Sequence, residues 1–447
     1  MTPPPSGSTA SNVREQRAWY VYDWANSAYM TTVVTLFLGP WLTVLARNAA
    51  GEDGFVYPLG IRVHPGSYWA YLVSLSVFSQ VVTLPLLGAI ADYGRRKKEL
   101  LGFFAYVGAF CTVAMFFLDG TRYLLGGVLF LVANLSFGAS TVLCNAFLPE
   151  IATPEERDAV SSKGWGLGYA GGGILLALNL LFYSRAADFG LTQGQAVRIS
   201  LASAGVWWAV FTLIPLMYLR NRGPRKALPP GASFVGIGLR QLRETIGDIG
   251  KYPQTILFLV AFLTYNDGIQ TVIMLASQFG QEEIKLSMST LTSVVLLVQF
   301  VAFFGSLLFN WIASKIGNKH AVMLSLVIWT GTLIYIYLAV RTEAEFYLMA
   351  VFVGLVLGGS QALSRSIFSL MIPAGREAEY FSLYEISDKG TSWLGPLFFG
   401  LALQFTGSYR LGILSLIVFF LIGLLLLSRV NVARGIAESA GQSAARI

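Results

Sequence analysis

Long apolar runs separated by short polar segments dominate the chain. A helix needs about 20 mainly apolar residues to cross roughly 30 Å of hydrocarbon. By that length the pattern predicts about twelve transmembrane helices in an all-α membrane protein. We expect them at residues 18–46, 67–91, 99–118, 122–147, 164–184, 199–219, 254–280, 287–313, 320–340, 344–371, 381–406 and 409–429.

The polar segments divide these helices into two groups of six. We expect a disordered cytoplasmic tail at 1–17, a first half at 18–219, a basic cytoplasmic linker at 220–253, a second half at 254–429 and a cytoplasmic tail at 430–447. The loop at 91–97, after the second run, is similar to the loop at 314–320, after the eighth. Such an internal repeat is typical of transporters built from two related six-helix halves.

Composition supports a membrane environment and accounts for the positive charge. The chain is 55% hydrophobic and 12% charged, whereas globular proteins average roughly 25% charged residues. Most of the 31 Lys and Arg residues lie in loops on one side, which places both termini in the cytoplasm of a bacterial inner (plasma) membrane. The net charge of +7 therefore reflects topology, and we expect no nucleic-acid partner.

The residues that usually carry cofactor chemistry are sparse. Cys111 and Cys144 lie in apolar runs, and His64 and His320 lie in separate loops, so we expect neither a metal site nor an enzyme. The stretch at 166–171 matches G-x-G-x-x-G, but no strand precedes it. Small residues four apart in this region instead indicate close helix packing, and we expect no cofactor.

The loop after the second run contains a recognisable motif. Residues 88–98 read Gly-Ala-Ile-Ala-Asp-Tyr-Gly-Arg-Arg-Lys-Lys, which resembles the loop between helices 2 and 3 of the major facilitator superfamily. That resemblance implies that Asp92, with Gly94, Arg95 and Arg96, latches the cytoplasmic side. A tight turn beside a topological basic cluster is the alternative, although an acid at a helix C-terminus opposes the helix dipole.

Further stretches narrow the resemblance to one family. They are Tyr-Asp-Trp-Ala-Asn-Ser-Ala at 22–28, Tyr-Asn-Asp-Gly-Ile-Gln-Thr at 265–271, Gly-Ser-Gln-Ala-Leu-Ser-Arg-Ser at 359–366, Leu-Tyr-Glu-Ile-Ser-Asp-Lys at 383–389, and Gly-Pro at 395–396. They resemble the vacuole effluxer-like family of the major facilitators, whose fungal members resemble vacuolar amino-acid exporters linked to autophagy. The resemblance implies the major facilitator fold, alternating access and a monomer.

Ionisable side chains inside a span are costly and usually mark a pathway. Asp267 lies about thirteen residues into its run, roughly 20 Å deep at 1.5 Å per residue, near the middle of the membrane. It is a candidate to bind a substrate amine or to carry a coupling proton. The alternative is a structural ion pair with Lys389, which lies in the eleventh run.

The superfamily resemblance also places Asn266, Gln270, Asn26 and Asn134 as candidates for contact with substrate, because their runs line the central cavity in that fold. Three charged residues nearer the inner face have a gating or a structural interpretation. They are Asp23, which could cap the start of its helix, and the Glu385 and Arg365 pair, which could bridge the halves or extend to the membrane surface.

Together these features predict a secondary active transporter of small polar organic solutes, with amino-acid efflux coupled to protons as the favoured form. Its partners are then the solute, protons and the lipid bilayer. Two alternatives remain at this point: a membrane solute sensor that does not transport, and an enzyme or lipid-handling protein on the same scaffold. A sensor usually carries an added soluble domain, and an enzyme needs a nucleophile–base or metal cluster at depth.

Overall fold

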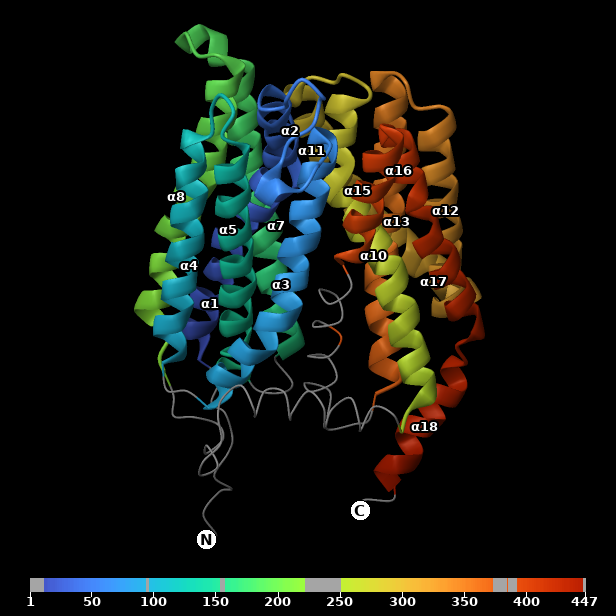
Figure 1. Ribbon diagram of the computed structural model, residues 1–447. Helices are drawn as coiled ribbons and strands as arrows, with labels where there is room; N and C mark the ends of the chain where they lie inside the picture. The colour runs from blue at the N-terminus through green and yellow to red at the C-terminus, as the bar shows by residue number, and fades with distance from the viewer. Residues whose placement is uncertain are drawn as a thin grey trace. The chain divides into compact units, whose positions relative to one another are not determined.

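The computed structural model describes residues 12–93, 96–152, 157–221, 251–372, 384 and 392–444. Almost all of these residues lie in helices joined by short loops (Figure 1). Ten helices in this part of the chain are long and apolar enough to cross a membrane. The prediction of an all-α membrane protein is confirmed.

The chain forms two compact units that do not follow the boundary between the two groups of six runs. Unit 1 comprises Met1–Trp41 and Val82–Arg240, and unit 2 comprises Leu42–Val81 and Gln241–Ile447. The end of the first span, from Leu42 onward, and most of the second span therefore belong to the unit that contains the C-terminal part of the chain.

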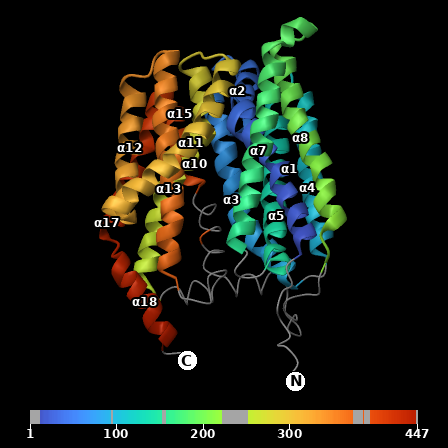
Figure 2. The same cartoon turned by 180° about the vertical axis from the view of Figure 1, so that it is seen from behind.

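Unit 1 is a bundle in which α1 packs against α7 and α8, and α4 packs against α5 and α8 (Figure 2). Its elements are α1 (Val13–Ala28), the π-helical segment η1 (Tyr29–Phe37), the start of α2 (Leu38–Asn48), the end of α3 (Pro65–Tyr93), α4 (Lys97–Ala114), η3 (Met115–Phe117), α5 (Tyr123–Asn145), α6 (Leu148–Ile151), α7 (Arg157–Ser184), η4 (Ala186–Phe189) and α8 (Gln193–Tyr218).

Unit 2 contains the remainder of α2 and α3, and its largest helix contacts are those of α11 with α13 and of α10 with α17. Its other elements are η2 (Pro58–Gly60), α10 (Pro253–Glu282), α11 (Met288–Ile316), α12 (Asn318–Leu338), α13 (Glu343–Leu370), α15 (Leu394–Thr406), α16 (Tyr409–Ser415), α17 (Ile417–Arg429) and α18 (Val432–Ala444).

Local sequence explains several helix ends. Thr192 and Gln195 form a capping box at the start of α8, which satisfies backbone N–H groups that have no partner within the helix. The side chain of Asn12 caps α1 by accepting from the backbone N–H of Glu15. The first helix thus begins at Val13 rather than at residue 18, and the interpretation of Asp23 as its cap is wrong.

Two of the predicted runs, at 67–91 and 381–406, are not among these ten helices. Helix α3 matches the predicted run at 67–91. Helix α15 matches the second part of the run at 381–406, and the earlier residues of that run lie outside the described residues, apart from Tyr384.

The glycine-rich stretch of the fifth span is a close packing surface. A side chain on Gly168 would meet Ser27 Oγ at 2.7 Å, and one on Gly171 would meet the carbonyl oxygen of Trp24 at 2.5 Å. Both contacts lie between α7 and α1, whose backbones approach closely because these positions lack a Cβ. The interpretation of this stretch as helix packing is confirmed.

Candidate functional site

Asp267 lies deep in α10, and its carboxylate is fixed by the backbone of another helix. The side chain is 1% exposed. The backbone N–H of Gly395 lies 3.0 Å from Oδ1 and 3.1 Å from Oδ2. Gly395 is in the first turn of α15, where N–H groups have no partner within the helix and carry partial positive charge. Asp267 therefore acts as a cap, supplied by α10, for the N-terminus of α15.

The space around this cap requires a glycine. A Cβ on Gly395 would collide with the hydroxyl of Thr271 and would lie 2.8 Å from Asp267 Oδ1. Thr271 donates its own hydroxyl to the backbone carbonyl of Asp267 at 2.7 Å. The missing side chain at Gly395 is thus what lets the α15 backbone reach the carboxylate.

The sequence stretches that carry the family resemblance meet around α10. Tyr265 and Ser364 form a hydroxyl–hydroxyl hydrogen bond of 2.5 Å, which joins the 265–271 stretch to the 359–366 stretch. The Asp267–Gly395 contact joins it to the 395–396 stretch. Asn266 is buried beside them, whereas Gln270 is partly exposed. Lys389, the alternative partner of Asp267, lies outside the described residues.

The remaining candidates for solute contact belong to unit 1. Asn26 is buried in α1 and donates its side-chain N–H to Thr141 Oγ1 of α5 at 3.4 Å. Asn134 is buried in α5, about two turns before Thr141. Asp23 lies against α7, where a Cβ on Gly164 would come within 2.5 Å of its Oδ2.

The π-helical segment in the middle of the first span has no signal in the hydrophobic pattern. Within η1, the hydroxyls of Tyr29 and Thr32 are buried and make no hydrogen bond to any described residue. Buried polar groups are usually hydrogen-bonded, and π-helical segments occur frequently at functional sites. Tyr29 and Thr32 are therefore polar candidates that sequence reasoning missed.

The cytoplasmic motif is only partly visible. Gly94, Arg95 and Glu385 lie outside the described residues, and the side chain of Asp92 is not described either. Arg96 is exposed immediately before α4, and Arg365 is exposed in α13. The latch at Asp92 and the bridge between Glu385 and Arg365 therefore stay predictions.

The last basic residues of the motif contribute an ion pair that the sequence did not single out. Lys97, at the start of α4, pairs with Glu150 of α6, and their side chains are 2% and 6% exposed. Lys97 also lies 5.3 Å from the centre of the Phe147 ring. This buried contact ties the start of the third span to the loop after the fourth within unit 1.

A second polar cluster in unit 2 joins the end of the first span to α10. Gln278 is fully buried and donates to Thr43 Oγ1 at 2.8 Å and to the carbonyl of Gly66 at 2.7 Å. One turn further along α10, Glu282 forms an ion pair with Arg47 of α2. From the sequence, Arg47 counted only as a topological charge, and no pattern identified its acidic partner.

His64, in the loop between the first and second spans, lies in the same region of unit 2. Its Nδ1 accepts from the backbone N–H of Gly66 at 3.2 Å, and its own backbone N–H donates to Gln404 at 2.6 Å. Burial lowers the pKa of His64 below its usual value, and the positive charge of Arg47 lowers this pKa further.

Solved structures with the same fold are transporters. The chain matches a bacterial homolog of the human lysosomal transporter Spinster with a TM-score of 0.66 and 14% identity, covering 96% of this chain and 99% of that one. It matches the E. coli xylose transporter XylE with a TM-score of 0.64 and 12% identity, covering 96% and 98%. At these identities the likeness shows the fold alone, and it confirms the major facilitator fold.

Relatives by sequence extend over nearly the whole chain. The MFS-type transporter YxiO of Bacillus subtilis (strain 168) is 30% identical over 93% of this chain and 95% of its own length. Autophagy-related protein 22-1 of Penicillium rubens is 26% identical over 97% of this chain and 92% of its own. The protein is thus a multi-pass membrane transporter of the major facilitator type and not an enzyme. With residues 11–440 matched by the family model, the chain belongs to the vacuole effluxer Atg22-like family.

Proposed function

We propose that the protein moves a small polar organic solute by alternating access, with amino acids as the favoured class, efflux as the direction and protons as the coupling ion. The name of the family, vacuole effluxer, supports movement of a solute across a membrane. Location in a bacterial inner membrane with both termini in the cytoplasm, and function as a monomer, belong to the same proposal.

The observation that carries the coupling proposal is the carboxylate of Asp267 at the N-terminus of α15. A charged carboxylate is stabilised there by the helix dipole and by a charge-assisted hydrogen bond from Gly395. Protonation removes that charge and weakens the cap, which frees the start of α15 to move. Asp267 would then couple proton binding to the position of a helix in the second half of the chain.

The polar contacts around Gln278 support a gate on the side away from the termini. Arg47 and Thr43 come from the first span, whereas Gln278 and Glu282 come from α10. These contacts would have to break for a path to open between the first span and α10. Asn266, Gln270, Asn26 and Asn134, with Tyr29 and Thr32 added, are the proposed contacts for the polar groups of the solute.

Counterflow in proteoliposomes tests the proposal directly. Vesicles containing the purified protein are loaded with a mixed pool of amino acids and small metabolites, and mass spectrometry identifies what leaves, with and without a pH gradient. The variant Asp267→Asn keeps a hydrogen-bond acceptor at the cap but cannot carry the charge. Asp188→Asn, at an exposed position in η4, is the matched control.

We expect one class of amino acid to leave from vesicles with the wild type and with Asp188→Asn, faster with a pH gradient. Asp267→Asn should still exchange solute but should not respond to the gradient. If Asp267→Asn responds to the gradient normally, Asp267 is not the coupling residue. If folded wild-type protein binds an amino acid and moves none, the protein is a sensor and the transport proposal fails.

A further inference from the structure

A groove on unit 1 has no role in the proposed transport path. It has a volume of about 520 Å³ and is formed mainly by one face of α8, with single contributions from η3 and α7. Every side chain in its wall except one serine is apolar. The wall consists of Phe116, Leu175, Ile199, Ala202, Ser203, Val206, Trp207, Val210 and Phe211.

The groove faces away from the core of the unit. Val206 and Val210 are each 52% exposed, although both lie within a helix that crosses the membrane. Trp207 stacks on Trp24 at 5.5 Å and packs against Phe211 at 4.7 Å, so the floor of the groove is a fixed aromatic surface. In a bilayer, an open apolar groove of this kind is exposed to lipid hydrocarbon.

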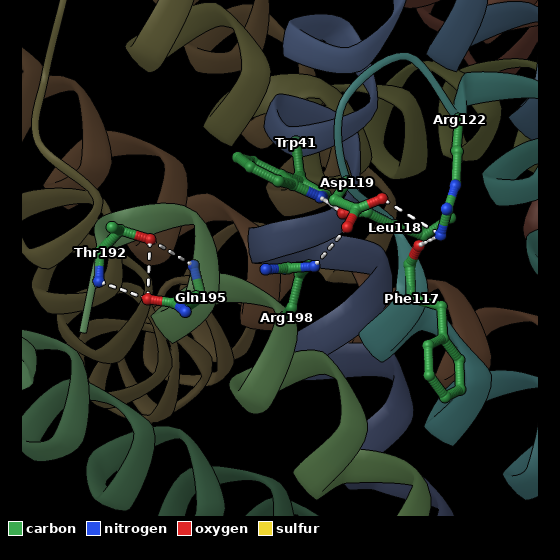
Figure 3. Close-up of polar contacts among 8 residues, drawn as sticks. All are labelled: Trp41, Phe117, Leu118, Asp119, Arg122, Thr192, Gln195 and Arg198. Carbon is green, nitrogen blue, oxygen red and sulfur yellow. Dashed lines mark hydrogen bonds and ion pairs between the residues drawn. The ribbon is translucent and has the colours of Figure 1, made fainter.

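Positive charge gathers at one end of the groove. Asp119 lies between Arg122 and Arg198, with an oxygen 3.2 Å from a guanidinium nitrogen of each (Figure 3). Two cations share one carboxylate, which leaves a net charge of +1. The Nε of Arg198 is buried and makes no hydrogen bond to any described residue.

The charged end and the apolar groove are continuous. The guanidinium carbon of Arg198 lies 5.7 Å from the centre of the Phe116 ring, and Phe116 lines the groove. Ile199, the residue after Arg198 in the chain, also lines it. The capping box of Thr192 and Gln195 fixes the start of α8 just before Arg198 (Figure 3).

We propose that this groove binds an anionic membrane phospholipid, with one acyl chain along α8 and the phosphate at Arg198. The groove supplies apolar surface for the chain, and the cluster of Arg122, Asp119 and Arg198 supplies a complementary charge for the headgroup. Arginine is well suited to phosphate because its planar guanidinium presents several donors. The lipid is a ligand distinct from the transported solute.

Native mass spectrometry of the full-length protein in detergent tests this proposal with three lipids of identical acyl chains: phosphatidylglycerol, phosphatidylethanolamine and diacylglycerol. Arg198→Gln removes the phosphate contact. Arg185→Gln, an exposed arginine in the loop between α7 and α8, is the matched charge control. Val206→Trp fills the groove from its exposed side, and Ala202→Phe is a second filling variant in case the first does not fold.

We expect the wild type and Arg185→Gln to retain phosphatidylglycerol in preference to the other two lipids. Arg198→Gln should weaken phosphatidylglycerol binding by about tenfold or more, as expected for the loss of a charge-assisted contact to phosphate. A folded filling variant should lose binding as well. Equal retention of all three lipids, equal losses in the two arginine variants, or full binding by a folded filling variant would each overturn the proposal.

Discussion

Lys97→Met should destabilise unit 1 strongly, because it would remove the cation that pairs with the buried carboxylate of Glu150. The two side chains are 2% and 6% exposed in the structure. Removing one partner of a buried ion pair typically costs about 3–5 kcal/mol, since the remaining charge keeps its desolvation penalty and loses the attraction of that partner. Lys98→Met is the control, because Lys98 is partly exposed and forms no ion pair with any described residue.

The double variant Lys97→Met/Glu150→Leu separates the ion pair from the space it fills. Replacing both charges by apolar groups of similar volume is often neutral or stabilising. We therefore expect the double variant to lie within about 1 kcal/mol of the wild type, or above it, so that the coupling energy between the two positions is about 3 kcal/mol or more.

Unfolding in detergent, followed by tryptophan fluorescence against denaturant, measures the free energies of five proteins. They are the wild type, the single variants Lys97→Met and Glu150→Leu, the double variant, and the control Lys98→Met. The control Lys98→Met should change the free energy of unfolding by less than about 0.5 kcal/mol, as surface substitutions usually do. A loss of less than about 1 kcal/mol in Lys97→Met would refute the reasoning. Such a value is typical of a hydrated surface pair, not of a buried one.

Two further predictions concern packing and pH. Gly168→Leu should separate α1 from α7, because its Cβ alone would meet Ser27 Oγ at 2.7 Å. It should therefore reduce the folded yield on size-exclusion chromatography. The control Gly173→Leu, which has open space at its Cβ, should leave that yield unchanged. His64 has a pKa lowered by burial and by Arg47, so the unfolded state binds the proton first. Thermal stability should therefore fall as pH drops below about 6.5, and His64→Gln should reduce that fall; an unchanged profile would contradict this account.

The local sequence determined the fold class because the bilayer imposes a simple rule on it. Twenty-residue apolar runs must form helices, since no water is present to satisfy a bare backbone. The family stretches around Asp267 and the recurring glycines of the fifth span could also be identified from the sequence, because polar residues and glycines are conspicuous within a mainly apolar run. The interpretation of the glycines as helix packing needed only their spacing.

Contacts between distant segments had no such signal. The sequence placed Asp267 at mid-membrane, but only the tertiary structure showed that its partner is a backbone N–H of α15, because a backbone group leaves no trace in the pattern of side chains. Arg47 and Lys97 looked like topological charges until the fold brought Glu282 and Glu150 to them. The interpretation of Asp23 as a helix cap failed because the polar segment before it is itself helical, so the helix already begins at Val13. Periodicity and composition describe one helix at a time, and the site depends on how helices far apart in the chain pack together.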